Sequence, residues 1–418
     1  MKIAWVCNTL IPEVAEKANL VLNKPESWIS GLHSLFLNQK DLTITYYFPN
    51  NTPLKLKEKN FYYLSFPSID SKRECKKTYD FFFKAFAIDP PDVVHVFGTE
   101  FPHTLSVLKA CQALGIKKRC VIHIQGLVSF CALHNSIRLP FSVKYGVSFR
   151  DFLKNDSVYK QNIKFKKRGK FETKALLMTQ NVIGRTDWDK SIVRKLNPDC
   201  NYHFCNEVLR NNFYNNHWSI NNCERHSVFV SQSNYSLKGF HVVLESIYAV
   251  KKVFPDVKVY TTGKNILDKR MLSRIKLTRY QQYLVKLIKK YKLENSVVFL
   301  GYLNEKKMCE RMCKSHVFVL SSFLENSSNS LGESMMVGTP SISSYVGGVS
   351  SIFRDKIDGY CYPCDEPELL SYYIEKIFND DSIALSFSDS SRKHAMATHD
   401  KEAIYKNLID IYAKISSL

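Results

Sequence analysis

The chain has 418 residues, which is enough for two or three domains of ordinary size. Hydrophobic residues make up 45% and aromatic residues 13%, so the composition excludes a disordered chain, and 15 glycines with 14 prolines exclude a collagen-like polymer. The 59 lysines and arginines exceed the 39 aspartates and glutamates by 20. A positive charge of this size attracts phosphates, anionic membrane surfaces or nucleic acid, and says nothing about the fold.

The twelve cysteines do not predict a disulfide framework. The sequence opens with a short apolar strand and not with a secretion signal, and it holds no run of about 18 apolar residues that would span a membrane. Free thiols in a reducing compartment are therefore expected, which favours a cytoplasmic protein. Cys361 and Cys364 form one C-x-x-C pair, and Cys309 and Cys313 lie one helical turn apart. A structural zinc site needs two pairs at matched spacing, so we expect no metal site.

Short apolar runs rich in β-branched residues recur along the chain, and each is followed by a helical pattern. Runs of this kind are typical of a parallel sheet that is buried on both faces. In the first half we expect strands at Ile3–Val6, Leu42–Tyr47, Val93–Phe97, Cys120–Ile124 and Val182–Ile183. In the second half we expect them at Val228–Val230, Val257–Tyr260, Val297–Leu300, Val317–Leu320 and Ser341–Ser343. The predicted fold class is α/β, with two parallel-sheet domains of similar size.

One of the intervening helices shows its period clearly. Its apolar residues fall at i, i+3, i+4, i+7 and i+14, in the order Phe240, Val243, Leu244, Ile247 and Phe254. This spacing predicts an amphipathic helix with one buried stripe.

The domain boundary is expected in an asparagine-rich segment between residues 200 and 225, which is poor in periodicity. We expect an N-terminal domain over residues 1–210 and a C-terminal domain over residues 211–399, with a helix at about 400–418 that packs back onto the first domain. The lysine-dense segment Asn155–Lys174 is expected to form a basic helix or loop on the surface of the first domain.

The densest chemical signal lies in residues 320–358. A strand that ends near Ser321 leads into a loop of small polar residues and then into a helix that starts near Leu331. Ser330 is the expected N-cap of this helix and Gly338 its expected stop. Such a loop offers backbone N–H groups to a phosphate, and it lies at the carboxyl end of the strands, where open α/β sheets bind ligands.

Two carboxylates, Glu325 and Glu333, bracket this loop with seven residues between them. Carboxylates accept hydrogen bonds from sugar hydroxyls, so both are candidates for binding a sugar or a nucleoside. Ser330 and Glu333 also fit a capping box, in which Glu333 needs no ligand. The pair alone leaves both interpretations open.

Further motifs follow the pair in a fixed order: Gly338-Thr339-Pro340, Gly347-Gly348 and Asp358-Gly359. Together with Glu325-x7-Glu333 they resemble the C-terminal half of glycosyltransferase family 4. The resemblance covers about residues 226–375 well and the first domain loosely. It implies a GT-B fold, in which two Rossmann-like domains face a central cleft. It also implies a retaining hexosyltransferase that uses a nucleotide-sugar, of the kind that builds bacterial capsular polysaccharide, exopolysaccharide or lipopolysaccharide.

Carried over residue by residue, the resemblance implies a donor site in the second domain. Glu333 would bind the ribose hydroxyls, Glu325 the hydroxyls of the transferred sugar, and Lys238 the diphosphate. A cation there would stabilise the charge that develops on the leaving group. The alternative for Lys238 is an ordinary exposed lysine before a helix. The implied donor-binding residues are Asn329, Ser330, Leu331, Gly332, Glu333, Lys238 and Arg185, and the implied catalytic residues are Glu325, Lys238 and Gln125.

Two positions depart from the family pattern. The family usually has an arginine a few residues before the diphosphate lysine, and this chain has Ser233 there. Either another cation, Arg185 or Arg210, would have to contribute, or the diphosphate is held with less charge. Many members carry a histidine in a T-x-H-G run where this chain has Gln125. An amide can bind a sugar hydroxyl, but it cannot transfer a proton.

Candidates for the acceptor side follow the early strands. Glu100 and His103 are expected in the loop after the strand at residues 93–97, and Thr9 follows the first strand. His95 lies inside an apolar run and is expected to be a core histidine.

The resemblance implies no cofactor and no metal, because the leaving phosphate itself helps to deprotonate the incoming hydroxyl. The implied partners are a nucleotide-sugar donor, a glycan or lipid-linked glycan acceptor, and the anionic inner face of the cell membrane. The alternative within the same fold is a sugar phosphorylase or a nucleotide-sugar epimerase, which product analysis would separate from a transferase. A nucleic-acid-binding protein would need a recognisable module or a groove of interleaved basic and aromatic residues, so no nucleic acid partner is expected.

Overall fold

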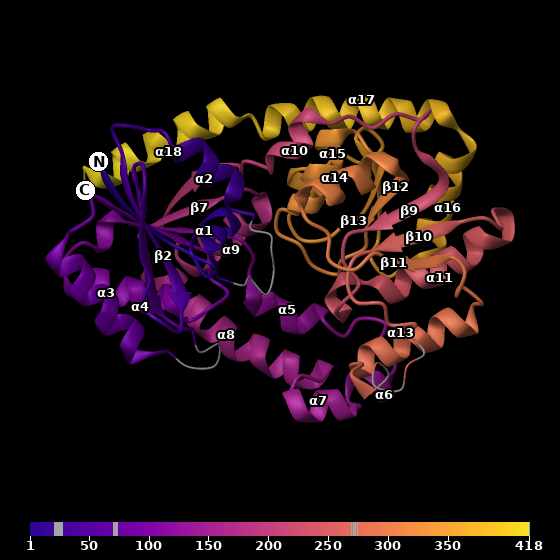
Figure 1. The fold of residues 1–418 in the computed structure, drawn as a ribbon, viewed down its shortest axis with the longest axis horizontal. Coiled ribbons are helices and arrows are strands. Elements are labelled where there is room, and N and C mark those ends of the chain that lie inside the picture. Colours follow the sequence, from indigo (N-terminus) through magenta and orange to yellow (C-terminus); the bar gives the residue numbers. More distant parts are fainter. Residues whose placement is uncertain (21–27, 70–73, 269, 271–272, 274, 418) are drawn as a thin grey trace. The chain divides into compact units, whose positions relative to one another are not determined.

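The computed structural model describes residues 1–20, 28–69, 74–268, 270, 273 and 275–417. The contacts within the chain divide it into two compact units, each with its own sheet (Figure 1). Unit 1 consists of Met1–Phe130, Lys164–Val208 and His399–Leu418, and unit 2 consists of Cys131–Ile163 and Leu209–Thr398.

Unit 1 is built on a sheet whose described strands number eight, in the order β3-β4-β2-β1-β5-β6-β7-β8. Its neighbours pair in parallel, apart from β3, which runs antiparallel to β4. The strands are β1 (Lys2–Val6), β2 (Thr43–Asn50), β3 (Lys55–Glu58), β4 (Phe61–Pro67), β5 (Val93–Phe97), β6 (Cys120–His123), β7 (Asn181–Gly184) and β8 (Asn201–Phe204). The helices that lie wholly or partly in unit 1 are α1 (Pro12–Lys17), α2 (Ser30–Phe36), α3 (Lys76–Ile88), α4 (His103–Ala113), η1 (Lys117–Arg119), α5 (Val128–His134), α8 (Val158–Met178), α9 (Asp187–Leu196) and α18 (Lys401–Ser416).

The last of these helices, α18, packs into the core of unit 1. Trp5 of β1 donates its indole N–H to the Tyr412 hydroxyl at 2.9 Å, and Nδ1 of His95 lies 2.6 Å from the same oxygen. Burial lowers the pKa of His95 to about 3, so this histidine is a neutral core residue, as expected from its apolar run.

Unit 2 is built on a sheet whose described strands number six, all parallel, in the order β11-β10-β9-β12-β13-β14. The strands are β9 (Glu224–Val230), β10 (Lys258–Thr261), β11 (Val297–Phe299), β12 (Ser315–Leu320), β13 (Ser341–Ser344) and β14 (Gly359–Tyr362). The helices are α6 (Phe141–Lys144), α7 (Phe149–Lys154), α10 (Asn211–Asn215), η2 (Ser236–Lys238), α11 (Phe240–Val253), α13 (Arg279–Lys290), α14 (Glu305–Lys314), α15 (Asn329–Val337), η3 (Val349–Ser351), α16 (Pro367–Asn379) and α17 (Asp381–Thr398).

The predicted fold class is confirmed, because both units are α/β with parallel sheets. Every predicted strand is present within a few residues of its expected bounds, and the helix predicted from Phe240 is α11. Its residues Phe240, Val243, Leu244 and Ile247 are fully buried. The unpredicted strands β3, β4, β8 and β14 carry aromatic and polar residues in place of β-branched runs, and three of them lie at sheet edges.

The segment of residues 131–163 belongs to unit 2, which corrects its expected assignment to the first domain. Val143 and Val158 are buried in the main core cluster of unit 2, together with Tyr280. A carboxylate oxygen of Asp151 accepts a 2.7 Å hydrogen bond from the backbone N–H of Arg279. Because these anchors are single valines and a buried acid, the hydrophobic pattern of the segment did not reveal them.

Candidate functional site

The helix α15 starts two residues earlier than the sequence indicates. Its N-cap is Ser328, whose hydroxyl accepts a hydrogen bond from the backbone N–H of Leu331, so the expectation of Ser330 as N-cap is wrong. Gly338 ends the helix in the left-handed conformation, as expected. The first turn of α15, where the helix dipole favours an anion, contains four of the expected donor-binding residues: Asn329, Ser330, Leu331 and Gly332.

Lys238 and Glu325 lie in direct contact at the carboxyl ends of the central strands of unit 2. The Lys238 ammonium lies 2.5 Å from Oε1 of Glu325, and Ser322 donates its hydroxyl to the same oxygen at 2.6 Å. Burial alone would lower the pKa of Lys238, but the charge of Glu325, with a further contribution from Tyr235, raises it above its ordinary value. Lys238 therefore carries its charge throughout the physiological pH range.

Two glycines allow the loops that carry this pair to approach each other. A Cβ atom on Gly239, which adopts a φ of +67°, would lie 1.9 Å from the carbonyl oxygen of Ser321. A Cβ atom on Gly347, at a φ of +51°, would lie 2.0 Å from the carbonyl oxygen of Glu325. The hydroxyl of Ser321 also donates to the Lys238 carbonyl at 2.8 Å. The backbone therefore fixes the distance between the cation and the carboxylate.

Glu333 is held by Arg210, the residue that precedes α10. Nε and Nη2 of Arg210 donate to the two carboxylate oxygens at 2.6 and 2.7 Å, and both side chains are buried. The Arg210 guanidinium also lies over the ring of Phe213, 5.0 Å from its centroid. This geometry removes the capping-box interpretation, because the carboxylate of Glu333 binds a side chain and not the helix terminus.

Ser233 stands where the family pattern has an arginine, and it carries no charge. This serine is buried, and its hydroxyl donates to the carbonyl of Thr262 at 3.3 Å. Arg210, one of the two cations that the sequence offers in its place, lies in unit 2 and is bound to Glu333. The other, Arg185, lies in unit 1, where its guanidinium is buried, 2.7 Å from Glu207 and 3.3 Å from the amide oxygen of Gln125. Its contact with a donor stays a prediction.

In unit 1, Glu100 and Gln125 follow the ends of the neighbouring strands β5 and β6. A Cβ atom on Gly98 would lie 2.3 Å from a carboxylate oxygen of Glu100 and 3.8 Å from Cγ of Gln125, so all three share one site. Burial raises the pKa of Glu100 to about 7, with a smaller contribution from the charge of Glu172. Two residues singled out from the sequence therefore lie together: Glu100, a carboxyl group that titrates near neutral pH, and Gln125, an amide.

The other two acceptor-side candidates differ in outcome. His103 is wrong as a loop residue, because it begins α4, is buried, and stacks on Phe66 with 5.9 Å between ring centroids. Burial lowers its pKa to about 3, so it is a neutral core residue. Thr9 lies after β1 and is half-buried, and its carbonyl accepts a 2.7 Å hydrogen bond from the Tyr46 hydroxyl.

Sequence reasoning missed Glu172, which lies in the lysine-dense segment that was expected on the surface. Glu172 is buried in α8, where it accepts hydrogen bonds from the Thr99 hydroxyl at 2.7 Å and from the backbone N–H groups of Val128 and Ser129, both at 2.9 Å. The available signal was its isolation as an acid among lysines. Glu172 fixes the loops that follow β5 and β6, and so supports the site of Glu100.

No group of three or more histidine, cysteine, aspartate or glutamate side chains among the described residues could hold a metal ion. All twelve cysteines are free. Within the described part of the chain, none of the helices has the length and apolar character needed to cross a lipid bilayer.

Known proteins are similar to this chain in two ways. Residues 212–394, which cover Lys238, Glu325 and Glu333, match the family model "Glycosyl transferases group 1". An uncharacterized glycosyltransferase of Methanocaldococcus jannaschii is 24% identical over 133 residues, which make up 32% of this chain and 34% of the length of that relative. The stretch that resembles this family model lies within unit 2.

Solved structures match the whole chain at the level of the fold. Sucrose-phosphate synthase of Thermosynechococcus elongatus has a TM-score of 0.74 at 14% identity and is aligned over 100% of this chain and 99% of its own. HepE of Anabaena, solved in complex with UDP, has a TM-score of 0.66 at 14% identity over 100% of both chains. A glycosyltransferase of Rickettsia africae has a TM-score of 0.64 at 14% identity over 99% of this chain and 98% of its own. The chain has the GT-B fold.

Proposed function

We propose that this protein is a retaining glycosyltransferase of family 4, which transfers a hexose from a nucleotide-diphosphate sugar to a glycan acceptor in the synthesis of a bacterial surface polysaccharide. The observation that carries the proposal is the contact between Lys238 and Glu325 beside the first turn of α15. A cation, a carboxylate and a helix N-terminus match the three parts of a sugar diphosphate: its charge, its hydroxyls and its phosphate oxygens.

In the proposed reaction the bond between the anomeric carbon and the diphosphate oxygen breaks, and a bond to the acceptor oxygen forms on the same face of the sugar. The proton of the acceptor hydroxyl passes to the leaving phosphate. Lys238 would stabilise the negative charge on that leaving group, and Glu325 would orient the sugar through its hydroxyls. The contact between the two side chains would then open, so that each binds its own part of the donor.

Glu333 is proposed to bind the ribose hydroxyls while it stays bound to Arg210. Each carboxylate oxygen accepts one hydrogen bond from Arg210 and has a second lone pair for a hydroxyl. Arg210 thus acts as a positioning residue, because it fixes the direction in which the remaining lone pairs point.

The acceptor is proposed to bind unit 1 near Glu100, Gln125 and Thr9. The carboxyl of Glu100, whose pKa is about 7, can accept a hydrogen bond from an acceptor hydroxyl or donate one to it near neutral pH. We further propose a cytoplasmic enzyme that needs no metal and that contacts the inner face of the cell membrane, where a lipid-linked acceptor would be found.

Thermal denaturation with UDP, GDP, ADP and their sugar derivatives tests the donor site. UDP and UDP-glucose come first, since the HepE structures of the same fold contain them. Ligand at about 100 times its dissociation constant should stabilise the protein by about 2.7 kcal/mol. A rise in melting temperature with one nucleotide that is lost in Lys238→Gln supports the proposal, and no rise with any nucleotide overturns it. The configuration of the product then decides between retention and inversion.

A further inference from the structure

The helix α7 has its polarity reversed with respect to an ordinary surface helix. Phe149, Phe152 and Leu153 fall at i, i+3 and i+4, the spacing of a buried stripe, yet they are 63%, 76% and 65% exposed. The buried residue of the helix is Asp151, which is only 2% exposed. The helix therefore buries its single acid and exposes its apolar side chains.

The neighbouring residues extend this exposed apolar surface. The ring of Tyr145 lies 4.6 Å from that of Phe141 and 5.7 Å from that of Tyr159, between ring centroids. All three rings are exposed. We call the exposed apolar residues of this segment the α7 face: Phe141, Tyr145, Val147, Phe149, Phe152, Leu153 and Tyr159. Scattered exposed apolar residues are ordinary, but a cluster of this size in nineteen residues marks an interaction surface.

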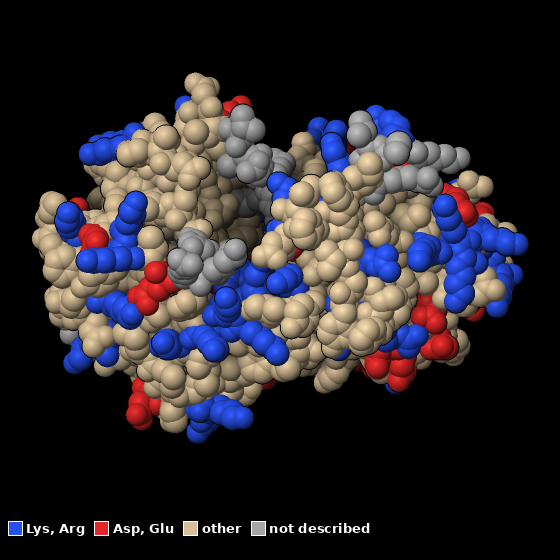
Figure 2. Space-filling view, turned by 90° about the horizontal axis from the view of Figure 1, so that it is seen from below, with Lys and Arg blue, Asp and Glu red and all other residues tan. Residues whose placement is uncertain are grey.

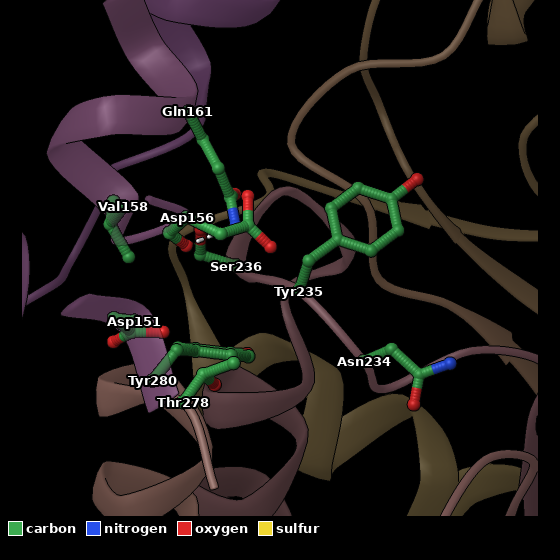
Figure 3. A pocket seen from close by; sticks show the side chains of 9 residues that line it. All are labelled: Asp151, Asp156, Val158, Gln161, Asn234, Tyr235, Ser236, Thr278 and Tyr280. Atoms are coloured by element: carbon green, nitrogen blue, oxygen red, sulfur yellow. Dashed lines mark hydrogen bonds between the residues drawn. The ribbon is translucent and has the colours of Figure 1, made fainter. Parts of the chain in front are cut away.

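The buried side of the segment that carries α7 is bonded to the rest of unit 2, and these bonds hold the α7 face in place. Ser148 and Asp151 form the capping box at the start of α7, and the Asp151 carboxylate also accepts a hydrogen bond from the backbone N–H of Arg279. The side chain of Arg279 in turn donates to the Ser142 carbonyl at 3.1 Å. A cavity of only about 20 Å³ remains between the segment and the rest of unit 2 (Figure 3). Figure 3 shows Asp151 beside Thr278 and Tyr280.

Most of the charges on the segment that carries the α7 face are positive, although one of its cations, Arg138, is paired with Glu245 at 2.9 Å. Residues 131–163 contain five cations: Arg138, Lys144, Arg150, Lys154 and Lys160. Their only acids are Asp151, which is buried, and Asp156, which lies 3.0 Å from the guanidinium of Arg150. Figure 2, the view from below, shows lysines and arginines in blue on this side of the molecule, together with groups of acids in red. The surface offers apolar rings and positive charge together.

We propose that the α7 face docks on an anionic lipid bilayer, with its aromatic rings at the level of the headgroups and its lysines on the lipid phosphates. This inference rests on the proposed function, since it names the surface by which the donor-binding unit would reach a lipid-linked acceptor. Exposed aromatic and aliphatic side chains flanked by lysines are the composition of helices that lie in the membrane interface. Each basic residue near an anionic surface adds attraction that falls with salt.

Sedimentation of the full chain with vesicles tests the inference. We expect binding to vesicles of phosphatidylcholine mixed with phosphatidylglycerol and little binding to phosphatidylcholine alone. The double variant Phe149→Ser, Phe152→Ser should lower the partition coefficient at least about tenfold, because two apolar side chains no longer leave water. Ile88→Ser is the matched control, since Ile88 is exposed in unit 1 and should change nothing. Equal binding by both variants would overturn the proposal.

A tryptophan reporter distinguishes insertion from charge attraction alone. The fluorescence of Phe152→Trp should shift to the blue with the mixed vesicles, and a shift that is absent would contradict insertion. Sedimentation velocity without lipid covers the alternative occupant: a dimer that dissociates in the double variant, with no vesicle binding, would assign the α7 face to a second copy of the chain. The nucleotide-induced rise in melting temperature is measured in the same variants. Its loss in every sample would refute the proposed function while vesicle binding still reports on the α7 face.

Discussion

Arg210 and Glu333 form a two-point ion pair, with their nitrogen and oxygen atoms 2.6 and 2.7 Å apart and both side chains buried. Arg210 comes from the first residues of unit 2 after the chain leaves unit 1, whereas Glu333 lies inside α15. The pair therefore ties the start of the unit to the helix whose first turn is the proposed diphosphate site.

Arg210→Ala should destabilise unit 2 by about 3–5 kcal/mol, since the change leaves the Glu333 carboxylate buried and without its cation. Urea denaturation measures the loss. Arg225→Ala serves as control, because Arg225 and Asp381 form a pair of similar length, 2.6 Å, that is exposed and should contribute about 0–1 kcal/mol. Similar losses of stability in the two variants would contradict a larger contribution from the buried pair. Glu333→Gln, which retains a hydrogen-bond acceptor for Arg210, is the better variant for measuring ribose binding.

Lys238→Gln should lower the rate of sugar transfer by about 10²-fold or more, because the leaving diphosphate loses its cation. Glu325 keeps its bond from Ser322, so the fold should be retained. Initial rates are compared with those of Lys252→Gln, an exposed lysine near the far end of the following helix. If Lys238→Gln retains full activity, Lys238 does not stabilise the leaving group.

Gly347→Ala should abolish the stabilisation by nucleotide-sugar, since its Cβ atom would lie 2.0 Å from the Glu325 carbonyl and displace this residue. Gly301→Ala separates this clash from backbone strain. Gly301 also has a positive φ, +73°, but no atom lies within 4 Å of its added Cβ. Both variants should lose about 1–2 kcal/mol of stability to the left-handed conformation, and Gly347→Ala alone should lose donor binding in the thermal-shift assay.

Glu100 should make the stability of the protein depend on pH. Its pKa is about 7 in the folded chain against 4.5 in the unfolded chain, so its protonated form favours folding. This contribution, on the order of 2–3 kcal/mol, is fully present below pH 4.5 and is lost as the pH rises through 7. We expect the melting temperature of Glu100→Gln to fall less between pH 5 and pH 8 than that of the parent chain. Glu402→Gln, an exposed carboxyl on α18, should follow the parent.

Dialysis against EDTA should leave the transfer rate unchanged, because Lys238 and the first turn of α15 are proposed to hold the diphosphate without a metal. The rate is measured before and after dialysis, and again with added Mg²⁺ or Mn²⁺. A loss that the metal restores would show that the diphosphate is held through a bound cation.

The sequence predicted the parts of the fold that depend on short-range patterns. The apolar runs marked the central strands, and the period from Phe240 marked α11, because a buried parallel strand and an amphipathic helix each leave a repeating signal. The edge strand β8 escaped, since its residues are half-exposed and follow no run of β-branched side chains. The start of α15 was misplaced because several serines in a row can each cap a helix, and only the backbone conformation selects Ser328.

The sequence could not predict contacts between distant segments. It named Arg210 only as one of two possible cations, and nothing local to either residue indicates that Arg210 and Glu333, 123 positions apart, share a two-point bond. The burial of Glu172 depends on Thr99 and on two backbone N–H groups from another loop. Residues 131–163 fell inside the expected first domain because the few side chains that anchor them to unit 2 leave no repeating pattern in the sequence.

The return of α18 to unit 1 has a consequence for the order in which the protein can fold during synthesis. The hydroxyl of Tyr412 completes a hydrogen-bonded contact with Trp5, 407 positions earlier in the chain. The ribosome must therefore produce all of unit 2 before unit 1 receives its last core helix. Unit 2 can close as soon as residue 398 has emerged, whereas unit 1 waits for the helix that completes the contacts of Trp5 and His95, and its exposed apolar surface is prone to aggregation during that time.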